Sequence, residues 1–395
     1  MMRSKMLSVM RCVAVALLCV VSACAMSARS AKDTPLKDAF AGKFDIGMAL
    51  TQDMILGKDP EGLEILLRNC NVVIPANAFK SNMLQPVDGG WRWVYADSCV
   101  SIAERNGLEL VGHALMWHPH VQARWRPKGD GSFEGTRDEF KRWMKDYITA
   151  VVTRYKGKVK VWDVVNEAIM EDGTYRNSPM YYFLGEEWIP LAFEYAHAAD
   201  PDAKLYINDY AMWEPKKRAT YKRIVKDLRR RGIPIYGIGM QSHFLIDHAL
   251  WGHTPERFDE AIKDLASTGC RILITEFEIS ALPKIWGREL PGGATPDPEA
   301  VRAKKDPYPD GLPRDVEQRW DKLMTDMMNV MINNADVIDR ISTWGVRDQD
   351  SGYNEFAGVG ARTDYPLWFD RRGRLKAPMV KIVDRLVREQ KHKRR

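Results

Sequence analysis

The chain has 395 residues, of which 45% are hydrophobic and 28% charged, a composition typical of globular proteins and unlike that of disordered or collagen-like chains. Its formal net charge is +6, but the basic excess lies at the two ends of the chain, so the body is close to neutral. This distribution excludes an extended nucleic-acid-binding surface, and we expect no nucleic-acid partner.

Residues 1–23 have the parts of an export signal: a basic start, an apolar run at 12–21 that is too short to span a bilayer, and small residues at the exit. Val-Ser-Ala-Cys at 21–24 resembles the bacterial lipoprotein cleavage box, in which Cys24 becomes the lipidated first residue, although 23–25 also fits ordinary A-x-A processing. We expect an exported lipoprotein of the bacterial cell envelope that touches a membrane only through Cys24, or otherwise a secreted protein.

After a linker predicted at 24–40, short apolar or alternating runs alternate with stretches of helical periodicity. The predicted strands are 44–50, 71–74, 109–113, 159–166, 204–208, 235–241, 271–276 and 340–344. The predicted helices are 59–67, 93–105, 137–155, 183–199, 215–231, 255–267, 313–333 and 377–390.

Strict alternation of strand and helix predicts an α/β fold with parallel strands, and eight repeats favour a closed (β/α)8 TIM barrel. We expect one domain over residues 41–390, a basic tail at 391–395, and a monomer. The irregular stretch at 280–312, rich in Pro and Gly, is expected to form a wall of the cleft.

Polar residues gather where the predicted strands end, the face at which such barrels carry their chemistry. Glu167 follows the fourth strand and Glu276 ends the seventh. Two opposed carboxyl groups suit glycoside hydrolysis, and a separation of about 5–5.5 Å between them gives retention through a covalent intermediate. A lone Glu at a strand end would more simply pair with a neighbouring Arg or Lys, but the polar residues on adjacent strands favour catalysis.

Five segments lie in order on the predicted strands: Gly-His-Ala-Leu-Met-Trp-His at 112–118, Trp-Asp-Val-Val-Asn-Glu-Ala at 162–168, Leu-Tyr-Ile-Asn-Asp-Tyr at 205–210, Gly-Ile-Gly-Met-Gln-Ser-His at 237–243 and Ile-Thr-Glu at 274–276. Together they resemble the motifs of glycoside hydrolase family 10, the endo-β-1,4-xylanases. The likeness runs from about residue 44 to residue 384. It implies a (β/α)8 fold, a retaining mechanism and a polysaccharide substrate, and we expect no cofactor and no metal.

The resemblance implies that Glu167 is the general acid/base and Glu276 the nucleophile. Asn166 would bond the 2-hydroxyl of the sugar at the cleaved position, and Gln241 would approach the same hydroxyl and the nucleophile. His243 would orient Glu276 and keep it ionised.

The remaining expected site residues surround that sugar. Lys80 and His113 would bond its hydroxyls, while Trp117 and Trp344 would form apolar walls, although ordinary core packing explains either ring equally well. The set is completed by Asn77 as a substrate-binding residue and by Glu278 and Tyr210 as supporting residues.

Some positions depart from the family's pattern. Ala76 and Ser81 replace a sugar-binding carboxylate and a Trp, Glu278 replaces an Asp, and Gly352 stands where a second Trp is usual. Loss of a charged hydrogen bond costs about 1.5–3 kcal/mol, so we expect an altered glycone subsite with weaker binding or with room for a decorated sugar.

The sequence therefore predicts a retaining endo-β-1,4-xylanase that cuts internal bonds of decorated xylan. Two alternatives stay open: a lipid-anchored barrel that binds glycans with hydrolysis lost or reduced, and a retaining β-glycosidase acting on a related β-linked polysaccharide. A third hypothesis, a metal-dependent hydrolase, comes from His113, His118 and His120, but no second cluster of ligand residues completes such a site.

Overall fold

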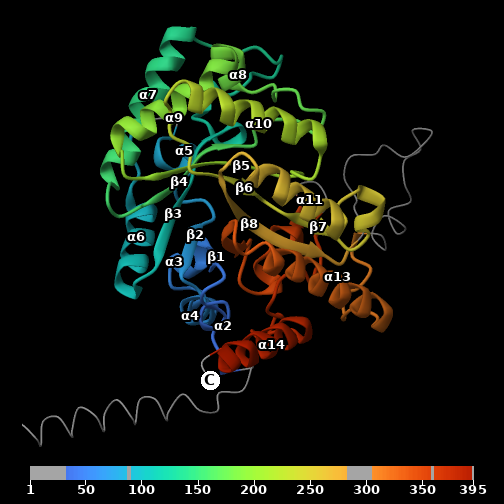
Figure 1. Ribbon diagram of the computed structural model, residues 1–395. Coiled ribbons are helices and arrows are strands. Elements are labelled where there is room, and N and C mark those ends of the chain that lie inside the picture. Colours follow the sequence, from blue (N-terminus) through green and yellow to red (C-terminus); the bar gives the residue numbers. More distant parts are fainter. Residues whose placement is uncertain (1–32, 87–89, 283–304, 357–359, 394–395) are drawn as a thin grey trace, which may run out of the picture.

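The computed structural model describes residues 33–86, 90–282, 305–356 and 360–393. Within these ranges, no helix is both long enough and apolar enough to cross a bilayer. Parallel strands form the centre of the molecule and helices surround them (Figure 1).

Eight strands build a closed barrel, as the alternation of elements predicts. Each strand pairs in parallel with its neighbours along the chain, and β1–β9 and β6–β8 pairing completes the ring. The barrel strands are β1 (Asp45–Leu50), β2 (Val72–Pro75), β3 (Glu109–Trp117), β4 (Val161–Asn166), β5 (Lys204–Asp209), β6 (Gly237–Met240), β8 (Arg271–Ser280) and β9 (Ile338–Thr343). The short β7 (His243–Leu245) extends the line of β6 and pairs with the end of β8, while β10 (Glu355–Phe356) and β11 (Gly360–Ala361) form a separate hairpin.

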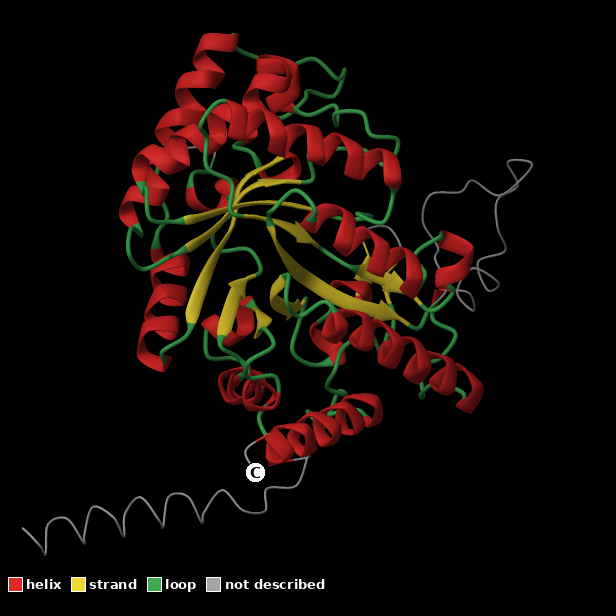
Figure 2. Cartoon of the chain, viewed as in Figure 1, coloured by secondary structure: helices red, strands yellow, loops and turns green. Residues whose placement is uncertain are grey.

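The helices cover the outside of this ring (Figure 2). They are α2 (Leu36–Ala39), α3 (Gln52–Ile55), α4 (Pro60–Asn69), α5 (Ser81–Leu84), α6 (Val94–Asn106), α7 (Arg137–Arg154), α8 (Pro179–Leu184), α9 (Trp188–Ala199), α10 (Pro215–Arg230), α11 (Pro255–Ala266), α13 (Arg314–Asn333) and α14 (Ala377–Lys393). A continuous apolar core lies between helices and strands. The barrel interior is filled by a second cluster comprising Val72, Ile74, Val111, Val161, Tyr206 and Leu273.

Three elements differ from the sequence prediction. The helix expected at 183–199 is divided into α8 and α9, because Gly185 adopts φ 61° and ends α8. β3 continues four residues beyond its predicted end at 113, and β8 continues to Ser280. In both strands the extra residues are almost all buried, so packing prolongs the strand past the point where polar residues suggested an end.

The C-terminal part of the linker expected at 24–40 packs against the core of the domain. Leu36, Ala39 and Phe40 are buried in the core, and the backbone N–H of Leu36 donates to Asn69 Oδ1 at 3.1 Å. The folded domain therefore includes residues before 41, and α14 continues to Lys393, into the tail expected at 391–395. Residues 1–32, with the expected signal and Cys24, and 283–304, most of the expected cleft wall, lie outside the described residues.

Candidate active site

Strained backbone marks the rim where strands end. Among the described residues other than glycine, three have positive φ: Glu167 (55°), Ala211 (47°) and Ser242 (64°). They follow β4, β5 and β6, respectively. Such conformations cost free energy and persist only where the surrounding structure holds them, and they cluster at functional sites.

Glu167 leaves β4 with its side chain partly buried. Its backbone N–H donates to the carbonyl of Asn208 at 2.9 Å, and Gln241 Nε2 donates to its Oε1 at 3.1 Å. Burial, together with the negative charge of Asp209, raises the pKa of the Glu167 carboxyl above its ordinary value. This carboxyl is therefore suited to carry a proton at a pH where an exposed glutamate would be ionised.

The surroundings of Glu276 shift its pKa in the opposite direction. Its Oε1 accepts from Asn208 Nδ2 at 3.0 Å and its Oε2 lies 3.2 Å from His243 Nε2. Burial acts to raise the pKa of Glu276, but the hydrogen bond from His243 and the accompanying charges outweigh it and hold the pKa below its ordinary value. The pKa values of the two glutamates are thus shifted in opposite directions, as suits an acid and a nucleophile.

His243 lies between two carboxylates. Its Nδ1 is 2.6 Å from Glu278 Oε1, and the Ser351 hydroxyl donates to Glu278 Oε2 at 2.6 Å. Burial acts to lower the pKa of His243, but its bonds to Glu276 and Glu278 raise it to about 10. The imidazole is therefore a cation at neutral pH and donates from both nitrogens.

A chain of amides joins the two glutamates. Asn208 Nδ2, which donates to Glu276, also donates to Asn166 Oδ1 at 2.9 Å. Gln241 Nε2, which donates to Glu167, lies 3.3 Å from that same Asn166 oxygen. This arrangement leaves Asn166 Nδ2 buried without a hydrogen-bond partner in the described structure, a donor available to a ligand hydroxyl.

Other expected residues lie after β2 and at the end of β3. Lys80 Nζ donates to Asn77 Oδ1 at 2.7 Å and lies 4.6 Å from the ring centroid of Trp117. Burial lowers the pKa of Lys80 to about 8, although the charges of Glu276 and Glu167 act in the other direction. The ammonium is therefore close enough to both carboxylates to sense their charge.

His113 and the two tryptophans complete this side of the site. His113 Nδ1 is 2.9 Å from Asp163 Oδ2, with both side chains buried, and its ring packs edge-on to Trp344 with centroids 5.2 Å apart. Trp117 and Trp344 are each partly exposed, so both rings offer surface to a ligand besides packing.

Two of the three histidines behind the metal hypothesis, His113 and His120, hydrogen-bond to other side chains, whereas His118 Nδ1 is buried without a hydrogen-bond partner in the described structure. His120 stacks on Trp117 with centroids 4.6 Å apart, and its Nδ1 lies 3.0 Å from Asn82 Oδ1. Burial lowers the pKa of His118 to about 4 and that of His120 to about 3. Within the ranges that the structure describes, no three His, Cys, Asp or Glu side chains are grouped as metal ligands.

Two of the positions that depart from the family's pattern, Ser81 and Gly352, have different surroundings. Ser81 is buried and its hydroxyl donates to the carbonyl of His120 at 2.6 Å. Gly352 is exposed, and a Cβ placed on it would meet no atom within 4 Å. The space beside the Gly352 backbone is therefore open.

Sequence reasoning missed several residues that contact the site. It placed Asn208 at a strand end without giving it a role, although Asn208 contacts both Asn166 and Glu276. Asp163 was not singled out because it lies within a strand, where a core side chain is expected. Arg176 carries no local signal, yet its Nε donates to the carbonyl of Glu167 at 2.8 Å and its Nη2 to the hydroxyl of Tyr210 at 2.6 Å. Tyr210 is therefore linked to Glu167 through Arg176.

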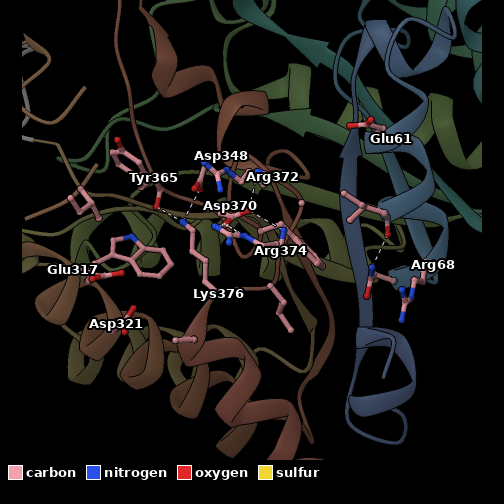
Figure 3. A pocket seen from close by; sticks show the side chains of 18 of the residues that line it. Glu61, Arg68, Glu317, Asp321, Asp348, Tyr365, Asp370, Arg372, Arg374 and Lys376 are labelled. Atoms are coloured by element: carbon pink, nitrogen blue, oxygen red, sulfur yellow. Dashed lines mark hydrogen bonds and ion pairs between the residues drawn. The ribbon is translucent and has the colours of Figure 1, made fainter. Parts of the chain in front are cut away.

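A cavity of about 990 Å³ lies elsewhere, between α4, α13 and the segment before α14. Lys376 lies in the wall of this cavity, and its Nζ is 2.7 Å from Asp348 Oδ1 and 2.7 Å from the carbonyl oxygen of Tyr365 (Figure 3). None of the residues expected to bind or cleave substrate lines this cavity. We therefore assign the site to the strand ends.

Comparisons with known proteins agree with this geometry. The profile of glycosyl hydrolase family 10 matches residues 35–385. The endo-1,4-beta-xylanase A of Xylanibacter ruminicola is 34% identical over 351 residues, covering 89% of this chain and 93% of that protein. The thermostable celloxylanase of Thermoclostridium stercorarium is 33% identical over 369 residues, covering 90% and 88%, respectively.

Solved structures show the same likeness. A GH10 endoxylanase retrieved from a sugarcane soil metagenome aligns with TM-score 0.79 and 34% identity over 89% of this chain and 99% of its own. Xylanase B from Clostridium stercorarium F9 aligns with TM-score 0.75 and 32% identity over 88% and 98%. The fold, the strand-end glutamates and these matches show that the chain belongs to glycosyl hydrolase family 10.

Proposed function

We propose that this protein is a retaining endo-β-1,4-xylanase, with Glu167 as general acid/base and Glu276 as nucleophile. The observation that carries the assignment is the opposite shift of the two carboxyl pKa values, raised at Glu167 and lowered at Glu276, within one hydrogen-bonded network. The relatives named as endo-xylanases support xylan as the substrate.

The proposed reaction has two steps. Glu276 attacks the anomeric carbon while Glu167 protonates the leaving oxygen, which gives a covalent glycosyl-enzyme. Glu167 then removes a proton from water, which hydrolyses that intermediate with overall retention. Asn166 would donate to the 2-hydroxyl of the sugar through its unpartnered Nδ2, and this bond would strengthen in the transition state.

Substitution of either glutamate tests these roles. Glu276→Ala and Glu167→Ala are each expected to lower kcat/KM on xylan by at least about a hundredfold, measured as release of reducing ends. Glu187→Ala, which changes an exposed glutamate paired with Arg231, is the matched control and should retain activity. NMR of the first product should show the β-anomer.

Two outcomes would contradict the proposal. Retained xylan hydrolysis in Glu276→Ala would remove the nucleophile assignment, and an α-anomer as first product would remove the retaining mechanism. Glycan binding by the wild-type protein without any release of reducing ends would instead support the alternative of a barrel that only binds.

We further propose that the glycone side accepts decorated xylose. The small side chain of Ala76 and the open space at Gly352 support this proposal. Product analysis on glucuronoxylan, arabinoxylan and linear xylo-oligosaccharides should show substituents retained close to the cleaved bond. Products cut only at unsubstituted stretches would contradict it.

Attachment to a membrane is a separate proposal. We propose that the protein is exported and anchored through a lipid on Cys24, because residues 1–23 have an export pattern and 21–24 fit the lipoprotein box. The barrel itself would act as a monomer, with its site built from a single chain.

A further inference from the structure

The backbone of Glu167 is held from outside its own strand. Its φ of 55° lies in the left-handed region, which a residue other than glycine occupies at a cost. Its N–H is fixed by the carbonyl of Asn208 at 2.9 Å, and its carbonyl oxygen accepts from Arg176 Nε at 2.8 Å. The backbone N–H and the backbone carbonyl of Glu167 therefore both have defined hydrogen-bond partners.

A tight turn returns the chain to Glu167. Met170 N–H donates to the carbonyl of Thr174 at 2.8 Å, and Arg176 N–H donates to the carbonyl of Ala168 at 2.8 Å. The antiparallel bridge between Ile169 and Tyr175 lies between these bonds. This hairpin fixes the backbone of Arg176 beside the end of β4.

The guanidinium is also held on its far side. Arg176 Nη2 donates to the Tyr210 hydroxyl at 2.6 Å. Lys217 Nζ lies 3.9 Å from the centroid of the Tyr210 ring and 2.9 Å from Asp209 Oδ1, and the Lys217–Asp209 pair is fully buried. A buried ion pair thus supports the tyrosine that supports Arg176.

We infer that Arg176 is a positioning residue for the acid/base carboxyl of Glu167, acting through the Glu167 carbonyl and braced by Tyr210. The inference rests on the proposed function, because it needs Glu167 to be the acid/base. Rotation about the N–Cα bond of Glu167 (φ) turns its carbonyl and its side chain together, so without the Arg176 bond φ can relax and the carboxyl turns with it. A displacement of about 1 Å from the reacting atoms can cost about a hundredfold in rate.

Leaving-group dependence separates positioning from general structural damage. An acid must protonate a poor leaving group, whereas dinitrophenolate leaves without a proton, so kcat/KM on dinitrophenyl β-xylobioside reports the nucleophile alone. Arg176→Ala should lower kcat/KM on phenyl β-xylobioside by about a hundredfold and leave that on the dinitrophenyl substrate within about threefold. It should therefore resemble a weaker form of Glu167→Ala.

Further variants identify the contacts that matter. Arg176→Lys, which keeps one donor and the charge, should recover part of the lost rate on the phenyl substrate. Tyr210→Phe, which removes only the brace, should cost less than tenfold on that substrate. Arg137→Ala is the matched control, because Arg137 also donates to a backbone carbonyl, that of Phe183 at 3.0 Å, but contacts none of the site residues.

The outcomes distinguish this inference from the proposed function. If kcat/KM of Arg176→Ala falls equally on both substrates, or on neither, the positioning role is overturned while the proposed function stands. The proposed function is tested separately by the two glutamate variants. Glu276→Ala should lose activity on both the phenyl and the dinitrophenyl substrate, whereas Glu167→Ala should lose activity on the phenyl substrate alone. A wild-type protein that cleaves neither substrate would overturn both.

Discussion

At the scale of single residues, the site depends on one cation placed between two carboxylates. His243 bonds both Glu276 and Glu278, and these bonds raise its pKa to about 10. The imidazolium lowers the pKa of Glu276 against the effect of burial. At Glu167, burial and the charge of Asp209 outweigh the hydrogen bond from Gln241, so the pKa of this carboxyl rises.

His243→Ala should therefore change one limb of the pH profile. The working enzyme needs Glu276 ionised and Glu167 protonated, so kcat/KM falls at low pH when Glu276 gains a proton and at high pH when Glu167 loses one. Without the imidazolium, burial and the charge of Glu278 raise the pKa of Glu276, and the acidic limb should move to higher pH. The basic limb should stay within about 0.5 units, because Glu167 keeps its surroundings.

The pH dependence of kcat/KM on a soluble xylo-oligosaccharide measures both limbs. His248→Ala is a suitable control, since the imidazole Nδ1 of His248 lies 3.2 Å from the carbonyl of Ile246, outside the network that joins the two glutamates. An acidic limb that does not move in His243→Ala, or two limbs that move together, would contradict the role given to His243.

Sequence alone could predict the residues whose position follows from strand order. Glu167 and Glu276 end apolar runs in the sequence, and the structure connects them through the amides of Gln241, Asn166 and Asn208. Arg176 could not be predicted in this way, because its contact with Glu167 depends on the path of a hairpin and on a strained φ. The roles of the predicted site residues in catalysis stay predictions until the variants are measured.

At the scale of elements, the two ends of the described domain are fastened to each other. α14 packs against α2, and Gln390 Nε2 donates to the carbonyl of Ala39 at 2.9 Å. Leu36 and Phe40 are fully buried on either side of this contact. The short helix α2 therefore belongs to the core despite its four residues.

Deletion of residues 1–40 should destabilise the domain far more than deletion of 1–32. Burial of a Leu or Phe side chain contributes about 1.5–3 kcal/mol, so loss of Leu36 and Phe40 should lower the free energy of unfolding by about 3–6 kcal/mol. Urea denaturation of the two truncated proteins measures the difference. Equal midpoints would show that α2 does not stabilise the fold.

The alternation of elements predicted the barrel, whereas element boundaries depended on packing. Eight apolar runs separated by helical periods are sufficient to identify the repeating unit. The ends of β3 and β8 and the break at Gly185 could not be found from periodicity, because burial by neighbouring elements extends a strand and one left-handed glycine ends a helix.

At the scale of the whole molecule, the proposed anchor can be tested without disturbing the site. Wild-type protein expressed in a bacterial host with lipoprotein processing should be found in the membrane fraction, with a mature chain that begins at lipid-modified Cys24. Cys24→Ala should be released from the membrane with unchanged kcat/KM, because residue 24 precedes the described domain. Intact-mass spectrometry checks both proteins, and an unmodified wild-type chain beginning at Met26 would contradict the anchor.

The packing of α2 against α14 also determines how the barrel would be oriented on a surface to which it is tethered. Residue 45 begins the first strand and α2 packs against α14, so both helices lie at the base (Figure 1). Glu167 follows β4 and Glu276 lies in the second half of β8, toward the opposite rim. A tether joined to either end of the domain would therefore leave from the base and turn the rim outward. A fibre much longer than the enzyme could then lie across the rim without meeting the surface to which the tether is fixed.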